Sequence, residues 1–94
     1  MVKGTIKSLR ITLESTGTSV LAYVYLREVA AGQVVRTEPL GDAIMADYDA
    51  ENQLLGVEFL NAERADAAEM RRLAAQLQAP ELAGLDLAAM CQDK

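Results

Sequence analysis

The chain of 94 residues has the length of one domain, in which roughly two-thirds of the unfolded surface can be buried. Hydrophobic residues make up 51% and charged residues 24%, values that exclude an intrinsically disordered chain. The net charge of −5, with nine basic residues scattered among fourteen acidic ones, argues against binding to nucleic acid or to an anionic membrane surface.

The cellular location follows from features at both ends of the sequence. Cys91 is the single cysteine, so an internal disulfide is impossible. The segment from Met1 to Thr5 lacks the apolar stretch of a signal peptide, and no run approaches the roughly 18 apolar residues of a membrane span. We therefore expect a cytoplasmic protein in a reducing compartment.

The first two-thirds of the chain has the patterns of β-strands. Leu9, Ile11 and Leu13 alternate with polar residues, as in a half-buried strand. Pro39 lacks an amide donor, so it must lie at a strand end or on an edge. Turn-forming residues separate the segments, and we expect strands over Thr5 to Glu14, Val20 to Arg27, Val34 to Glu38, Ala43 to Asp49 and Leu54 to Leu60.

The last two strands fix their own alignment. If Asp49 pairs with Leu54, six apolar residues fall opposite one another on one face, namely Tyr48 with Leu55, Ala46 with Val57 and Ile44 with Phe59. A slip of one residue would set apolar groups against polar ones, so the pattern selects this register. The loop is then Ala50 to Gln53, in which Asn52 suits a left-handed conformation.

The period changes to that of a helix after Leu60. Asn61 is the expected N-cap, and Glu63 lies in the first turn. A stripe at helical spacing consists of Ala67, Met70, Leu73, Ala74 and Leu77. Pro80 ends this helix or begins the next one, which we expect from Glu81 to Cys91.

These elements predict an α+β fold, an antiparallel β-meander of about five strands followed by one or two C-terminal helices packed on one face. We expect a single domain over residues 1–94, with the β-meander at 5–60 and the helical tail at 61–92.

One stretch resembles a known family. Arg36 to Glu38, followed by Ala43 to Ala62, is similar to the small bacterial proteins called domain of unknown function 2283. The matching residues are Asp47, Asp49, Gly56, Val57, Glu58, Leu60 and Ala62, and the segment from Tyr23 to Leu26 resembles an earlier strand of that family. The turn at Ala50 to Gln53 departs from the acid-acid-Gly turn usual there. The resemblance implies a β-meander with a helix on one face, and it implies no catalytic residue.

The hairpin also imitates a calcium-binding loop. Asp47, Asp49 and Glu51 stand at positions one, three and five of such a loop, and Glu58 stands at position twelve. However, Asn52 replaces the glycine at position six, and strand patterns flank the loop where helices are required. We therefore favour a solvated hairpin, in which Asp47 and Glu58 share the solvent face of the sheet, over a metal site. We expect no cofactor.

Catalysis has little support in the sequence. The chain has no histidine, the commonest general base and metal ligand. Cys91 thus has no histidine partner, and nearby Asp93 opposes a reactive thiolate. Serine-nucleophile and phosphate-binding glycine motifs are absent from the sequence. We expect a protein that is not an enzyme.

Interface candidates lie at two places. Tyr23 and Tyr25 share the strand face opposite the expected core residues Ala22, Val24 and Leu26. They are either exposed anchors or covered by the helical tail or by the bend of the N-terminal strand. The second helical segment is apolar on more than one side, through Leu82 and Leu85 on one and Leu87 and Met90 on another. Such a segment must bury both sides or leave one as a binding patch.

The leading hypothesis is a non-enzymatic interaction module, a homodimer built through the C-terminal helices, a sheet edge or both. One alternative is a metal- or small-ligand-binding protein that uses the acidic hairpin face. Another is an antitoxin-like partner of a different protein.

Overall fold

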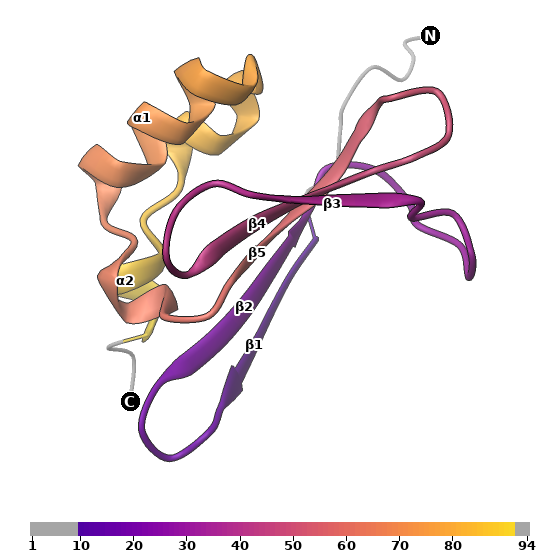
Figure 1. Cartoon of the computed structure of the whole chain (residues 1–94). Coiled ribbons are helices and arrows are strands. Elements are labelled where there is room, and N and C mark those ends of the chain that lie inside the picture. Colours follow the sequence, from indigo (N-terminus) through magenta and orange to yellow (C-terminus); the bar gives the residue numbers. More distant parts are fainter. Residues whose placement is uncertain (1–9, 92–94) are drawn as a thin grey trace, which may run out of the picture.

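The computed structural model describes residues 10–91, which form a five-stranded antiparallel sheet followed by helical segments (Figure 1). The predicted α+β class is confirmed. The part of the first expected strand before Arg10 lies outside the described residues. The elements are β1 (Arg10–Ser15), β2 (Val20–Tyr25), β3 (Arg36–Pro39), β4 (Ile44–Tyr48), β5 (Leu54–Phe59), the 3-10 helix η1 (Ala62–Arg64), α1 (Ala67–Leu77), the 3-10 helix η2 (Pro80–Gly84) and α2 (Leu87–Cys91).

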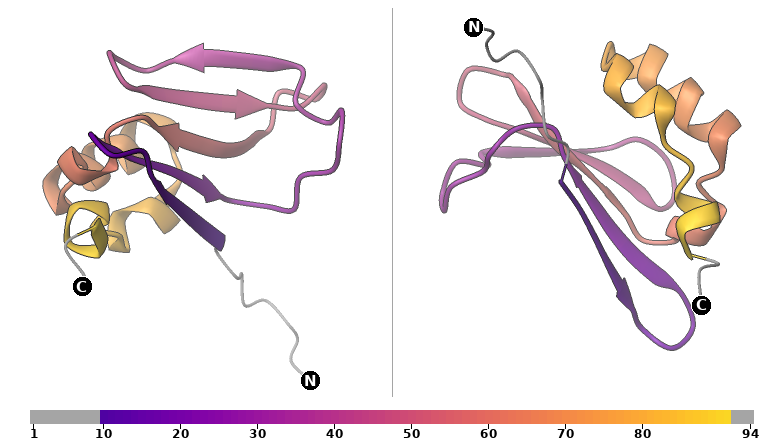
Figure 2. Two further views of the ribbon diagram at one scale, coloured as in Figure 1. Left: turned by 90° about the horizontal axis from the view of Figure 1, so that it is seen from below. Right: turned by 180° about the vertical axis from the view of Figure 1, so that it is seen from behind.

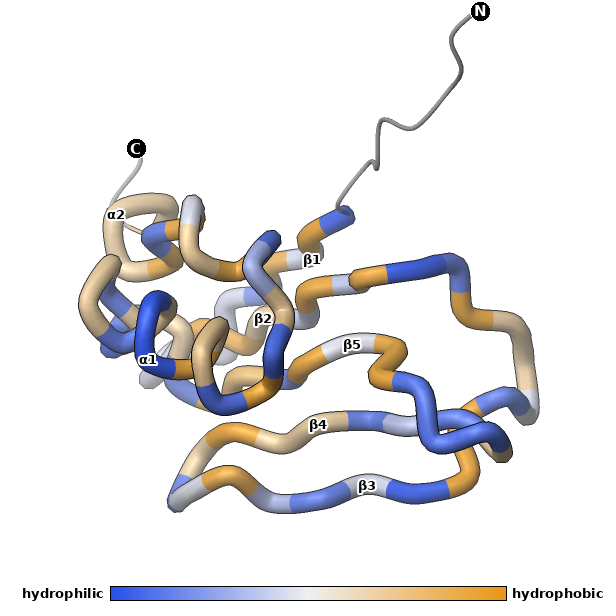
Figure 3. The backbone as a smooth tube through the Cα atoms, turned by 90° about the horizontal axis from the view of Figure 1, so that it is seen from above, coloured by the Kyte–Doolittle hydropathy of each residue, from blue (hydrophilic) through white to orange (hydrophobic). Residues whose placement is uncertain are grey.

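The strand order is β1-β2-β5-β4-β3, so the sheet is not the simple meander that we expected. β5 lies between β2 and β4, and the connection after β2 carries the chain to the far edge, where β3 begins. Burial explains this order. Residues 55–57 and Phe59 of β5 are buried, whereas β3 is short and mostly exposed and ends at Pro39. A strand buried in this way belongs at the centre of a sheet, and a polar strand with a proline belongs at its edge (Figure 3).

The predicted register of the last hairpin is confirmed over most of its length. Ile44 pairs with Phe59, and Ala46 pairs with Val57. Beyond these pairs a β-bulge shifts the ladder, so that Tyr48 lies opposite Leu54 rather than opposite the predicted Leu55. The prediction assumed an unbroken ladder, and alternation alone does not reveal an extra residue.

The turn after the bulge is closed by Asp49. Its Oδ1 accepts hydrogen bonds from the amides of Glu51 at 2.9 Å and Gln53 at 2.8 Å. Asn52 has a φ of 66°, the left-handed conformation that we predicted. The Asp49 side chain therefore takes the place of a backbone partner inside the loop.

The helices cover one face of the sheet, which we call the inner face (Figure 2). Ala22, Val24 and Leu26 are buried there, as the alternation predicts. The expected stripe of α1 contributes Met70, Leu73 and Ala74 to the same core. The sheet and the helices thus share one hydrophobic cluster, which gives the α+β architecture its stability.

The start of α1 differs from the prediction. Asp66 is its N-cap, and its carboxylate accepts a hydrogen bond from the Glu69 amide at 3.0 Å. Asn61 precedes η1 instead and forms no side-chain capping bond. The reason is that a 3-10 turn with the buried Ala62 comes first and delays the α-helix by one turn.

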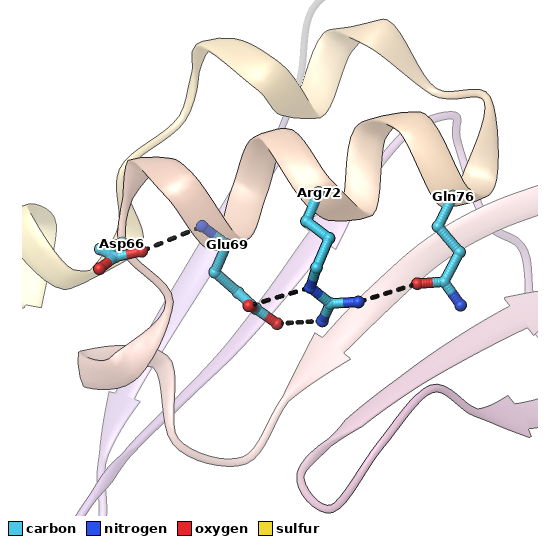
Figure 4. Close-up of polar contacts among 4 residues, drawn as sticks. All are labelled: Asp66, Glu69, Arg72 and Gln76. Atoms are coloured by element: carbon cyan, nitrogen blue, oxygen red, sulfur yellow. Dashed lines mark hydrogen bonds and ion pairs between the residues drawn. The ribbon is translucent and has the colours of Figure 1, made fainter.

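The polar side of α1 carries charged and amide side chains. Arg72 donates to Glu69 and, at 3.2 Å, to Gln76, which together form a row along the helix surface (Figure 4). Arg72 and Gln76 are exposed and Glu69 is half-buried, so the row supports the helix locally.

The second helical segment is interrupted. We expected one helix from Glu81 to Cys91, but η2 ends at Gly84 and Leu85 is extended before α2 begins at Leu87. Glycine is a poor helix former, and the break lets Leu82 and Leu87 both point into the core. Among residues 10–91, no helix is long and apolar enough to cross a membrane.

Candidate interaction surface

The sheet face opposite the helices, which we call the outer face, carries two rows of side chains that run across the strands. The strand register sets both rows. The first consists of Arg10, Tyr25, Gly56, Asp47 and Thr37, and the second of Thr12, Tyr23, Glu58, Met45 and Pro39. Among the described residues, the helices leave this face uncovered (Figures 1 and 2).

The two tyrosines named as interface candidates lie together on the outer face. The ring centroids of Tyr23 and Tyr25 are 4.4 Å apart, with their planes inclined by 48°. The Arg10 guanidinium carbon lies 4.0 Å from the centroid of the Tyr25 ring. Both tyrosines are half-buried, because they cover each other and Arg10 covers part of Tyr25. The helical tail, which we considered as a cover, packs on the other face.

A hydrogen-bonded group joins three strands across this face. The Tyr23 hydroxyl donates to Asp47 Oδ2 at 2.7 Å, and the Thr37 hydroxyl donates to Asp47 Oδ1 at 2.6 Å. Burial, followed by the hydrogen bond to Asp47 and its negative charge, raises the pKa of Tyr23 well above its ordinary range. Tyr23 therefore remains a donor, and both oxygens of Asp47 have partners within the sheet.

The four acidic residues considered as metal ligands are spread over different environments. Asp47 and Glu58 lie on the outer face, as predicted, in adjacent rows. Asp49 is buried in the turn that it closes, and Glu51 is exposed, where it accepts a hydrogen bond from the Gln53 amide group at 3.3 Å. Within residues 10–91, no three potential metal-binding side chains come together.

A cleft of about 300 Å³ lies between the β4–β5 turn and the end of α1. Its lining includes Leu26, Tyr48 and Leu77, together with polar residues of the turn. The four acidic residues of the hairpin are not part of this lining. The cleft is therefore separate from the acidic surface that suggested a ligand.

The apolar residues of the tail occupy different depths. Leu82 and Leu87 are fully buried in the chain's own core, and Leu85 is half-buried. Met90 is 37% exposed. The Ala88 amide donates to the carbonyl of Ala65 at 2.9 Å, which ties α2 to the segment before α1. The tail thus buries most of its apolar surface within the chain.

Cys91 lies half-buried at the end of α2. Burial and the nearby charge of Glu63 raise the pKa of the Cys91 thiol, which favours its protonated and weakly nucleophilic form.

The sheet has two edges, and β1 is the more open one. All residues of β1 are exposed except Ile11, which is half-buried. Leu13 points to the inner face but remains 44% exposed, because the helices do not cover this strand. Alternation predicted the direction of Leu13 correctly. The alternation does not indicate whether another part of the chain covers Leu13, so Leu13 was not among the interface candidates.

The resemblance to a known family is confirmed over the centre of the chain. Residues 21–63, from β2 to η1, match the model of a family described as protein of unknown function (DUF2283). No curated protein and no solved structure gives a match to this chain. The matched part contains the pair Tyr23 and Asp47, whereas β1 and α1 lie outside it.

Proposed function

We propose that this protein is a non-enzymatic homodimerisation module whose contact is the β1 edge of the sheet. The observation that carries the proposal is a strand of six residues at a sheet edge, with Leu13 44% exposed beside the half-buried Ile11. Unpaired backbone groups along a strand edge are a template for pairing with another chain. A second copy would satisfy these groups and cover Leu13.

The sheet edge has more support than the C-terminal helices. Two of the four apolar tail candidates, Leu82 and Leu87, are fully buried in the core, so a partner could contact them only if the chain unfolded locally. Met90 alone among the four is exposed by more than a third. A single exposed methionine is too small an area to hold two copies together.

The acidic hairpin has less support as a metal or ligand site. Both oxygens of Asp47 accept hydrogen bonds from hydroxyl groups, and Asp49 Oδ1 accepts two amides. A cation would have to compete with these donors for the carboxylate oxygens. An antitoxin-like role would use the same β1 edge with a different protein as the partner, and co-purification of the tagged chain from its native cell would reveal such a complex.

The location that we propose is the cytoplasm. Cys91 is a free thiol near the surface of α2. A reducing compartment preserves a thiol in this state.

Sedimentation equilibrium of the full chain tests the proposal. We expect a dimer at micromolar concentration, and Leu13→Lys should shift the equilibrium toward monomer because it places a charge at the contact. Val35→Lys is the matched control, since Val35 is also an exposed apolar residue, at 60%, but lies just before β3 on the opposite edge. A monomer at all concentrations up to 100-fold above this range would overturn the proposal.

A further inference from the structure

The backbone groups that β1 presents to solvent follow from the hydrogen bonds around it. The Thr16 amide donates to the Ser19 carbonyl at 2.9 Å, so this pair faces inward across the β1–β2 hairpin. In an antiparallel ladder the bonded pairs recur at every second residue. Arg10, Thr12 and Glu14 therefore bond to β2. The amides and carbonyls of Ile11, Leu13 and Ser15 point to the free edge, at which residues 10–91 supply no further strand.

The pairing on the other side of β2 agrees with this assignment. The Leu26 amide donates to the Leu55 carbonyl at 2.9 Å. Ala22 and Val24, two and four residues earlier, are then bonded to β5, which leaves Tyr23 and Tyr25 to bond with β1. These are the partners of Thr12 and Arg10 in the register.

The opposite edge of the sheet is interrupted by a proline. The Leu40 amide donates to the Ile44 carbonyl at 2.8 Å, so Thr37 and Pro39 are the residues of β3 that point away from β4. Pro39 has no amide hydrogen to offer an incoming strand. The outward residues of β1 all keep their amides, so β1 is the edge better suited to a further strand.

We infer that two copies of this chain pair β1 against β1 in antiparallel register about a two-fold axis at Thr12. This inference rests on the proposed dimerisation and specifies its geometry. Ile11 and the partner's Leu13 then exchange both backbone hydrogen bonds, because both residues belong to the set that points to the free edge. The two sheets join into one continuous sheet.

In this register the side chains of β1 are complementary to those of β1 in the partner copy. Arg10 lies opposite the partner's Glu14 on the outer face, and this opposite-charge pair occurs twice because of the two-fold axis. On the inner face Ile11 lies opposite the partner's Leu13, which covers the exposed leucine. The Tyr25 ring holds the Arg10 guanidinium on the outer face, where the partner's Glu14 would reach it.

The neighbouring register lacks this match. An axis at Leu13 is also compatible with the backbone groups, but it sets Arg10 opposite the partner's Thr16 and Ile11 opposite the partner's Ser15. Both ion pairs are then lost, and a single pair of Leu13 side chains replaces the two pairs of Ile11 with Leu13. An axis between two residues would set outward-pointing groups against inward-pointing ones and would leave the backbone bonds unmade.

Charge reversal tests the pairing of side chains. Arg10→Glu and Glu14→Arg should each raise the dimer dissociation constant by about tenfold or more, since each creates two like-charge pairs. The double variant should restore it to within about threefold, and an equimolar mixture of the two single variants should form a mixed dimer. Arg71→Glu on the exposed side of α1 is the control with the same change of charge as Arg10→Glu.

A covalent probe tests the axis itself. Thr12→Cys in a Cys91→Ser background should form a disulfide-linked dimer under mild oxidation, because a pair of this kind has its Cα atoms about 4.5 Å apart. Leu13→Cys in the same background should link poorly. Preferential linking through Leu13→Cys, or a dimer that responds to none of the charge variants, would overturn the register while leaving dimerisation intact. A chain that is monomeric throughout would overturn both.

Discussion

The ring of Tyr23 lies directly over Gly56 on the neighbouring strand. A Cβ atom at Gly56 would come within 2.3 Å of Tyr23 Cε1, far inside van der Waals contact. Glycine weakens the interior of a strand, and an aromatic ring packed over it from the next strand compensates for the missing side chain. Gly56 is part of the family-matched segment, and its lack of a side chain leaves room for the Tyr23 ring.

Gly56→Ala should lower the free energy of unfolding by about 1–3 kcal/mol, because the ring must move and its bond to Asp47 is disturbed. Urea denaturation monitored by circular dichroism measures the change. Gly84→Ala is the matched control, since nothing lies within 4 Å of the added atom there. Equal effects from both substitutions would contradict the packing of Tyr23 on Gly56.

Tyr23→Phe should lower the free energy of unfolding by about 1–2 kcal/mol, because Asp47 loses a donor that the bulk solvent replaces only in part. The pKa of Tyr23 is raised in the folded state, so the protonated hydroxyl stabilises the fold at neutral pH. That stabilisation is complete below the ordinary tyrosine value of 10.0 and is lost as the pH rises through the higher folded value. The urea midpoint of the native chain should therefore fall above pH 10 more steeply than that of Tyr23→Phe.

Asp49→Ala should destabilise the hairpin by about 1–3 kcal/mol, since the amides of Glu51 and Gln53 lose their shared acceptor. Asp49→Asn keeps an oxygen at the same place and should recover most of the loss. Added metal ions distinguish the two interpretations of Asp49, as the acceptor that closes the turn or as a metal ligand. A metal ligand would make the stability of the native chain depend on added calcium, and we expect calorimetric titrations with calcium, magnesium and manganese to remain flat at millimolar concentration.

Asp66→Ala should cost about 1 kcal/mol of stability, the usual effect of removing an N-cap acceptor. Asn61→Ala should change stability by less than about 0.5 kcal/mol, because the Asn61 side chain makes no capping bond. Thermal denaturation of the two variants distinguishes the cap that the structure shows from the cap that the sequence suggested. The larger loss at Asn61 would contradict this assignment.

Much of the fold could be predicted because alternation reports directly on burial. The inward residues of β2, the register of Ile44 with Phe59 and the stripe of α1 follow from apolar spacing alone. These features depend on local pattern, and the hydrophobic effect acts on them in the same way wherever the strand lies in the sheet.

The order of the strands could not be predicted in this way. Sequential strands are neighbours in most sheets, and this prior gave a meander. In the actual order, a long connection carries the chain from β2 to β3, and β5 is buried at the centre of the sheet. Whether the burial of β5 outweighs the cost of that connection depends on the packing of the whole chain. The delayed start of α1 and the break at Gly84 likewise depend on tertiary packing against the sheet.

The candidate surface was predictable only in part. Spacing placed Tyr23 and Tyr25 on one face, and the structure adds the contact with Gly56 and the bonds to Asp47. The openness of β1 depends on where the helices end, and no residue of β1 encodes that boundary. Leu82 and Leu87 were candidates because a sequence shows that a residue is apolar and does not show which surface it meets.

Pro39 has a consequence for the size of any assembly. A sheet with two usable edges could add copies at both sides and grow into an endless ribbon, as strands do in fibrils. Among the described residues, β1 is the edge better suited to pairing, and the two-fold contact that we propose would occupy it in both partners at once. The proposed assembly would then be closed, with a proline at each outer margin, and we expect it to stop at two copies.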